Sequence, residues 1–140
     1  MTLKWRISVS YVTFSHEIIM PSAKRKIGDE GEKVACKYLE GKGYKILERN
    51  YWKPWGEIDI VAEKGSVLSF VEVKSISRAT VRPEENMHPA KVARLHRAIQ
   101  TYLLDRKISH EKEWQVDLVC VSLDFSTRKA QVEVFENLIL

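Results

Sequence analysis

The chain has 140 residues, 44% of them hydrophobic and 30% charged, which is the composition of an ordinary globular domain. Its 23 basic and 19 acidic side chains leave a net charge of +4, which is compatible with nucleic-acid binding without requiring it. Cys36 and Cys120 form no C-x-x-C pair, which argues against a zinc site or a disulfide framework and for reduced thiols in the cytoplasm. No apolar run approaches the ~20 residues of a membrane-spanning helix, so we expect no membrane association.

The first 20 residues differ from the rest of the chain. A weak strand-like alternation of apolar side chains runs through them, at Trp5, Ile7, Val9 and Tyr11. The segment is too polar for a secretory signal, and Met20 begins a second plausible start. We therefore expect residues 1–20 to be an extension outside the core and residues 21–140 to form one domain.

The remaining pattern predicts the element order α-β-β-β-α-β-β. Apolar side chains at helical spacing predict helices over residues 22–40 and 89–106. Strands are predicted over residues 44–49, 55–61, 70–74, 114–121 and 131–135. Residues 50–56 are an aromatic-rich loop or strand entry, and residues 75–89 are a polar loop. This order favours an α/β fold with a central mixed sheet flanked by helices.

Two of the predicted strands carry acidic residues inside apolar, β-branched runs, at Glu57, Asp59 and Glu72. An ionised carboxylate in such a place is costly unless it is paired or bound to a metal. Because strand side chains alternate, Glu57 shares a face with Asp59, and Glu72 shares a face with Lys74.

A tight turn containing Gly65 joins these strands, and its length decides which residues meet. A symmetric loop places Glu57 opposite Glu72 and Asp59 opposite Phe70, so that all the charges share one face. An odd-length loop or a bulge would move one pair to the other face.

Such a cluster suits the hydrolysis of a phosphodiester bond with the help of one or two Mg²⁺ ions. Asp59 and Glu72 are the candidate metal ligands, and the backbone carbonyl of Val73 could add a third oxygen. Lys74 would lie beside the attacking water. Glu32, at the edge of the first helix's apolar stripe, is a candidate third acid, with a solvated helix residue as the alternative.

These residues resemble a known motif: Glu32, Gly43-Tyr44, Gly56-Glu57-Ile58-Asp59 and Phe70-Val71-Glu72-Val73-Lys74. The pattern is similar to the PD-(D/E)XK nuclease superfamily. It is closer still to the bacterial family UPF0102 (YraN-like), which is related to archaeal Holliday-junction resolvases. The resemblance covers residues 24–140, including the closing segment at residues 132–137. Two departures are Ile58, where the superfamily has proline, and Ile76, where the family often has arginine.

The resemblance implies a restriction-endonuclease-like fold with Asp59 and Glu72 as metal ligands, Lys74 as the catalytic lysine and Glu32 as a further acid. The implied function is a DNA endonuclease that depends on Mg²⁺ or Mn²⁺ and acts on branched or flapped DNA. A non-catalytic nucleic-acid-binding module with the same fold is the alternative, and a purely structural protein is a third. DNA is the expected partner, and a homodimer is left open.

The remaining candidates carry weaker signals. A phosphate-binding face could be formed by Arg78, Arg82, Lys91, Arg94 and Arg97, with a solvated helix face as the alternative. Glu57 is an accessory candidate, more often structural. Asp117, in an apolar strand, is expected to serve as a cap or to bond a neighbouring lysine.

Aromatic side chains cluster at Tyr51, Trp52 and Trp55. They could stack on unpaired bases, or they could pack in the core or at an interface. The four histidines show no metal-ligand spacing, and we assign them no function.

Overall fold

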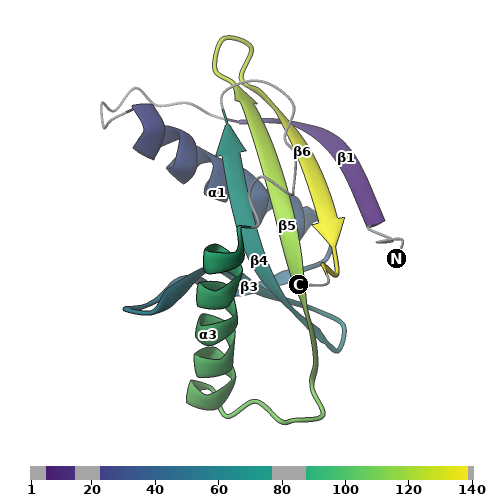
Figure 1. Ribbon diagram of the computed structural model, residues 1–140. Helices are drawn as coiled ribbons and strands as arrows, with labels where there is room; N and C mark the ends of the chain where they lie inside the picture. Colours follow the sequence, from purple (N-terminus) through teal and green to yellow (C-terminus); the bar gives the residue numbers. More distant parts are fainter. Residues whose placement is uncertain (1–5, 15–22, 77–87, 139–140) are drawn as a thin grey trace.

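The computed structural model describes residues 6–14, 23–76 and 88–138. The protein is α/β, with a mixed six-stranded sheet in the order β1-β6-β5-β4-β3-β2 and two helices in these ranges (Figure 1). The elements in chain order are β1 (Arg6–Thr13), α1 (Ala23–Gly41), β2 (Lys45–Lys53), β3 (Gly56–Lys64), β4 (Val67–Ile76), α3 (Pro89–Asp105), β5 (Glu113–Asp124) and β6 (Lys129–Glu136).

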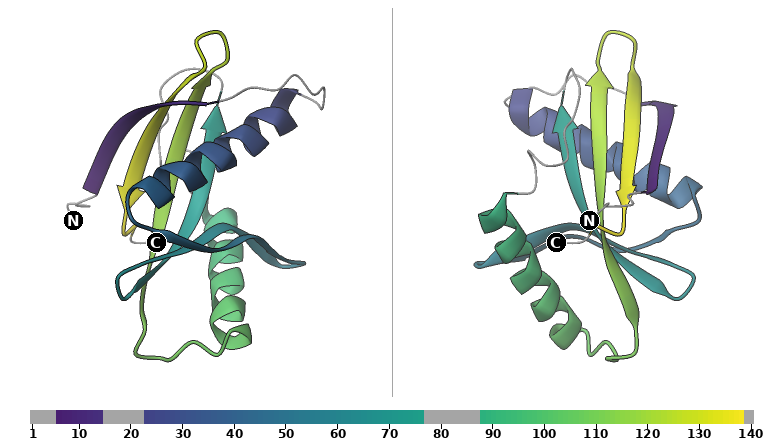
Figure 2. Two further views of the ribbon diagram at one scale, coloured as in Figure 1. Left: turned by 180° about the vertical axis from the view of Figure 1, so that it is seen from behind. Right: turned by 45° about the vertical axis from the view of Figure 1, so that its right-hand side comes forward.

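The helices cover opposite faces of the sheet (Figure 2). α1 packs mainly on β4 and β5, and α3 packs mainly on β3. β4 and β5 are parallel and are connected through α3, whereas the other four pairs of neighbouring strands are antiparallel. Within the described ranges, neither helix is long and apolar enough to cross a membrane.

Each face has its own hydrophobic cluster. On the α1 side, Leu39 and Ala35 pack with apolar side chains of the sheet such as Val119. On the α3 side, Ile99 and Phe70 belong to a second cluster. Since both faces of the central strands are covered, a charged side chain on β3 or β4 is removed from water unless it lies at an edge.

The N-terminal segment differs from the expectation. Residues 6–13, which the sequence places in an extension outside the core, form edge strand β1 and pair with β6 along its whole length. Phe14 follows with 7% of its surface exposed and packs in the α1-side core. The apolar members of its alternation, Val9 and Tyr11, are exposed, whereas Ser8 and Ser10 on the other face hydrogen-bond to the Tyr38 hydroxyl of α1.

The aromatic segment before the acidic strands is mostly strand. β2 runs to Lys53, so residues 50–53 belong to the sheet and not to a loop. Tyr51 is buried and stacks edge-to-face on Tyr102 of α3. This contact ties the β2–β3 hairpin to α3.

Candidate functional site

The acidic strands β3 and β4 form the expected hairpin, with a two-residue turn. Lys64 pairs with Val67, and Gly65 between them adopts φ 61°, which favours glycine. The expected register, with Asp59 opposite Phe70, requires a turn centred one residue earlier in the chain, so that register is wrong by two residues. A shift of two preserves the alternation of faces.

The corrected register brings Asp59 and Glu72 together. The ladder runs to the pair Ile60–Val71, and one more step sets Asp59 opposite Glu72 and not opposite Phe70. The expected pairing of Glu57 with Glu72 is therefore wrong. The central expectation, that the two candidate metal ligands meet on adjacent strands, agrees with this geometry.

β3 and β4 stop pairing at this point, while β4 continues beside β5 as far as Ile76. The backbone N–H of Val73 donates to Oδ2 of Asp59 at 2.8 Å, in place of a ladder hydrogen bond. The carbonyl and the N–H of a strand residue point toward the same edge, so the carbonyl of Val73 also faces the Asp59 side.

Asp59 is a frustrated carboxyl group. Burial raises its pKa, and the negative charges of Glu72 and Glu57 raise it further, so that the pKa of Asp59 is about 7. The hydrogen bond from Val73 and the charge of Lys91 act in the opposite direction without compensating. A proton or a cation at this position would relieve the strain.

Glu72 is the more deeply buried partner, with 6% of its surface exposed. Burial raises its pKa, and the nearby Lys91 ammonium lowers it. Nζ of Lys91, in the first turns of α3, lies 2.6 Å from Oε1 of Glu72. Sequence analysis assigned Lys91 to a phosphate-binding face, whereas this contact directs it to the acidic site.

Glu32 joins the same electrostatic group from α1. Burial and the charge of Asp59 raise its pKa, and Arg49 on β2, 3.7 Å away, lowers it. The preceding Gly31 allows this approach, since a Cβ there would lie 1.7 Å from Oγ of Ser75 on β4. Glu32 is thus partly buried toward the sheet and is not a fully solvated helix residue.

Lys74 does not contact these acids. Its side chain is exposed, and none of the hydrogen bonds or ion pairs found among the described residues joins it to Asp59 or Glu72. It follows Glu72 on the same face of β4 and is paired with Cys120 of β5. Among the described residues, the cation that contacts Glu72 is therefore Lys91 and not Lys74.

Glu57 and the basic residues surround this cluster. Glu57 is exposed, yet its charge raises the pKa of both Asp59 and Glu72. Arg94 and Arg97 are exposed on α3, as a phosphate-binding face requires. Arg78 and Arg82 lie outside the described residues. The group that approaches the acids most closely on the α3 side is therefore Lys91.

Asp117 is a structural acid, although its partners differ from those expected. It has 1% of its surface exposed and accepts hydrogen bonds from Nε2 of Gln115 and the backbone N–H of Asn137 at 2.9 and 2.8 Å. Burial raises its pKa, and these bonds together with one from Ser69 lower it. The bond from the Asn137 backbone agrees with the capping alternative, whereas no lysine is among these partners.

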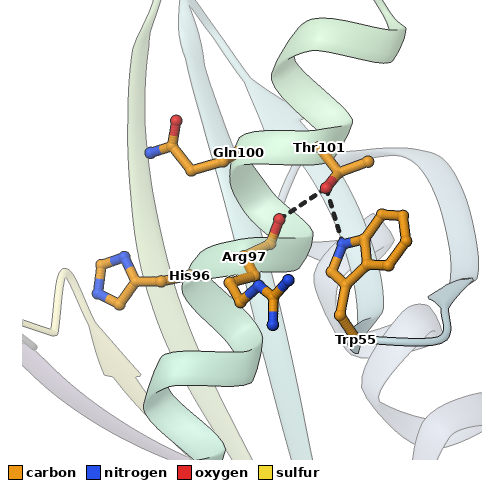
Figure 3. Close-up of a pocket in the computed structure, with 5 residues that line it drawn as sticks. All are labelled: Trp55, His96, Arg97, Gln100 and Thr101. Carbon is orange, nitrogen blue, oxygen red and sulfur yellow. Dashed lines mark hydrogen bonds between the residues drawn. The ribbon is translucent and has the colours of Figure 1, made fainter.

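The aromatic cluster divides into a core residue and exposed ones. Tyr51 is buried, whereas Trp52 and Trp55 have 65% and 37% of their surfaces exposed. Trp55 lines an open pocket on α3 together with His96, Arg97, Gln100 and Thr101 (Figure 3). Of these four, only Arg97 was among the residues proposed from the sequence. Their i, i+4 spacing on one helix face is the signal that could have identified them.

The donor set fits a hard divalent cation that is only partly held by protein. Asp59, Glu72 and the carbonyl of Val73 provide oxygen atoms, which Mg²⁺ and Mn²⁺ prefer. Within the described residues, no group of three or more His, Cys, Asp or Glu side chains is arranged to hold a metal. Mg²⁺ commonly keeps several waters and takes further ligands from a substrate phosphate, so two carboxylates suffice.

These features define a class of protein: an α/β domain with paired acids at the point where two central strands separate. The chain belongs to the uncharacterised protein family UPF0102, whose sequence profile matches residues 31–121. A UPF0102 protein of Wolinella succinogenes is 40% identical over 116 residues, which are 83% of this chain and 98% of that protein. One of Moorella thermoacetica is 41% identical over 119 residues, covering 84% and 98%. One of Thermotoga maritima is 49% identical over 79 residues, covering 56% and 72%.

Proposed function

We propose that this protein is a DNA endonuclease that uses Mg²⁺ or Mn²⁺ to hydrolyse phosphodiester bonds, with branched or flapped DNA as the substrate class. The observation that carries the proposal is the meeting of the partly buried Asp59 with the buried Glu72 beside the backbone of Val73. Two adjacent carboxyl groups, one buried and one partly buried, destabilise the folded protein, which a metal-binding function explains.

The fold supports the proposal in a second way. A restriction-endonuclease-like domain has a helix, an acidic hairpin, a second helix and further strands in this order. Here α1, the β3–β4 hairpin, α3 and β5 follow that order, with β4 and β5 parallel. Gly31 and Gly56 let both helices approach the acidic strands closely, since a Cβ at Gly56 would lie 2.2 Å from the carbonyl oxygen of Arg94.

In the proposed reaction, a water oxygen attacks phosphorus and the bond from phosphorus to the leaving oxygen breaks. The proton lost by the water goes to solvent, and the leaving oxygen takes up a proton. Asp59, Glu72 and the Val73 carbonyl would hold the cation, which supplies a Lewis acid and lowers the pKa of bound water. Lys74 is exposed two residues beyond Glu72 on the same face of β4, and it would neutralise charge on the phosphoryl oxygens. Glu32 would position a water or a second ligand from the α1 side.

A non-catalytic nucleic-acid-binding module is the second candidate, and one contact favours it. Lys91 already neutralises Glu72 at 2.6 Å, and Lys74 does not touch the acids. A protein that had lost catalysis could retain this ion pair as a structural substitute for metal. In the nuclease, by contrast, Lys91 must yield Glu72 to the cation or share it.

One assay separates these functions. The purified protein is incubated with branched, flapped, single-stranded and duplex DNA in Mg²⁺, in Mn²⁺ and in EDTA. The nuclease predicts cleavage that requires metal and that Lys74→Ala removes while largely retaining DNA binding. Equal product yields from Lys74→Ala and wild type, or binding without cleavage in either metal, would instead support the binding module.

A further inference from the structure

The pocket on the outer side of α3 has a composition unlike that of the acidic site. It is lined by Trp55, His96, Arg97, Gln100 and Thr101 (Figure 3). The lining contains no carboxylate and carries the fixed positive charge of Arg97. It therefore attracts an anionic ligand, where the neighbouring cluster of acids attracts a cation.

The tryptophan of this pocket is held in place before any ligand binds. The indole N–H of Trp55 donates to Oγ1 of Thr101 at 2.9 Å, and that hydroxyl donates to the backbone carbonyl of Arg97 at 2.8 Å. The adjacent Gly56 packs directly against the backbone of Arg94. The ring is thus pre-organised while 37% of the residue remains exposed, which lowers the entropic cost of stacking on it.

An unpaired nucleotide matches these groups. Its base presents a flat π face to an indole, and its edge presents donors and acceptors to side chains such as Gln100 and His96. Its phosphate carries the charge that Arg97 complements. A base inside a duplex is stacked on both sides, so it cannot offer a face to Trp55 without leaving the helix.

The pocket also lies at a useful distance from the acids. Trp55, in the turn that precedes β3, lies four residues before Asp59, so the two are separated by at most about 13 Å at ~3.3 Å per residue. That length corresponds to about four nucleotides at the ~3.4 Å rise of a duplex strand, and to fewer nucleotides of an unstacked strand. A strand bound at Trp55 can therefore continue to the acidic cluster along β3.

We propose that this pocket binds an unpaired base of the DNA strand whose backbone enters the acidic site. The inference rests on the proposed function and sharpens its substrate class to DNA with a single-stranded segment close to the cleaved bond.

The test measures binding in EDTA, where cleavage cannot interfere, with a fluorescently labelled short oligothymidylate and a duplex of equal length. Trp55→Leu should weaken oligothymidylate binding about tenfold or more, and Trp55→Phe, which keeps a ring, should retain most of it. Trp52→Leu is the matched control, since Trp52 is an exposed tryptophan of the same hairpin outside the pocket. It should bind like wild type.

A second readout does not require Trp55→Leu to fold. Oligothymidylate should quench tryptophan fluorescence in Trp52→Leu and should quench it less in Trp55→Phe. Equal quenching in both, wild-type binding by Trp55→Leu, or equal losses of duplex and single-strand affinity would overturn the base-binding pocket.

The two proposals fail separately. Metal-dependent cleavage combined with wild-type binding by Trp55→Leu would overturn the pocket and leave the nuclease in place. Trp55-dependent binding of single strands without cleavage in any metal would overturn the nuclease and support the pocket.

Discussion

Two acids of the same sheet, the buried Asp117 and the partly buried Asp59, show opposite ways of keeping a carboxylate out of water. Asp117 accepts hydrogen bonds from the Gln115 amide and from the backbone of Asn137, near the chain's last strand. Asp59 accepts one from the backbone of Val73 and otherwise faces like charge from Glu72.

Burial raises the pKa of both groups, and the neighbours decide the outcome. Around Asp117 the neighbouring donors lower the pKa again, so the carboxylate is satisfied and helps to hold the C-terminal segment. Around Asp59 the neighbouring acids raise it further. The comparison indicates that burial alone does not distinguish a candidate functional acid from a structural one, and that the balance of hydrogen-bond donors and like charges around it does.

The largest expected effect concerns cleavage. Asp59→Asn keeps the shape of the side chain and removes the charge that would hold the cation, so cleavage should fall by about 10³-fold or more. Asp117→Asn should leave cleavage per folded molecule within about threefold, because Asp117 lies outside the proposed site. Single-turnover rates with branched DNA measure both, and comparable losses in the two variants would remove the distinction.

Stability without metal should reverse that order. Asp117→Asn replaces a hydrogen-bonded carboxylate and leaves buried donors mismatched, which should lower the free energy of unfolding by about 3 kcal/mol. Asp59→Asn relieves repulsion and should leave the protein as stable or more stable. Urea unfolding in EDTA at neutral pH measures both. A protein destabilised equally by the two changes would show that Asp59 is also a structural acid.

The pH dependence should follow the raised pKa of Asp59, which is about 7 against an ordinary value of 3.8. The folded protein binds this proton more tightly than the unfolded chain, so the stabilisation is complete below 3.8 and is lost as pH rises through 7. The free energy of unfolding in EDTA should therefore fall by about 2 kcal/mol from pH 5 to 8 on this account. Asp59→Asn should flatten that part of the curve, and an unchanged slope would contradict the assignment.

Metal binding should stabilise the folded protein by mass action. At ten times the dissociation constant, Mn²⁺ should add about 1.4 kcal/mol to the free energy of unfolding. Asp117→Asn should retain this gain, and Asp59→Asn should lose it. A gain that persists in Asp59→Asn would place the ion elsewhere. Thermal melting at several Mn²⁺ concentrations measures the effect.

The smallest expected effect separates two cations of α3. Lys91→Gln frees Glu72, so Mn²⁺ should bind several-fold more tightly, a change of about 1 kcal/mol. Arg94→Gln, the matched control on the exposed face, should leave metal affinity unchanged and lower the salt dependence of DNA binding by about one counterion. Calorimetric titration with Mn²⁺ and DNA binding at several salt concentrations report the two effects. Weaker metal binding by Lys91→Gln would mean that Lys91 organises the site and does not compete with the cation.

Local pattern accounted for most elements of the fold. The predicted helices over residues 22–40 and 89–106 correspond to α1 and α3 within one residue at each end. Each core strand was also predicted, although β2 and β5 extend several residues beyond their apolar runs. The alternation at residues 5–11 indicated a strand but not its place in the sheet, because its apolar side chains Val9 and Tyr11 are exposed on edge strand β1.

The candidate site was likewise predicted only in part. Acidic residues inside apolar runs identified Asp59 and Glu72, and alternation placed them on one face. The register came out two residues off, because the turn consists of Gly65 and Ser66 and is centred one residue later than expected, a shift that leaves the alternation of faces unchanged. Lys91 was assigned elsewhere, since nothing in a helical repeat states which strand the first turn of that helix approaches.

The sequence by itself determined the identities and local periods: two amphipathic helices, apolar strands, and acids in positions where an unpaired charge is costly. Tertiary structure decided which charges meet. Strand register set Asp59 against Glu72. The close packing of α1 at Gly31 and of α3 against Gly56 brought Glu32 and Lys91 toward these acids. Lys74 remained exposed. Contacts between elements distant in the chain depend on packing distances and turn lengths, which local periodicity does not encode.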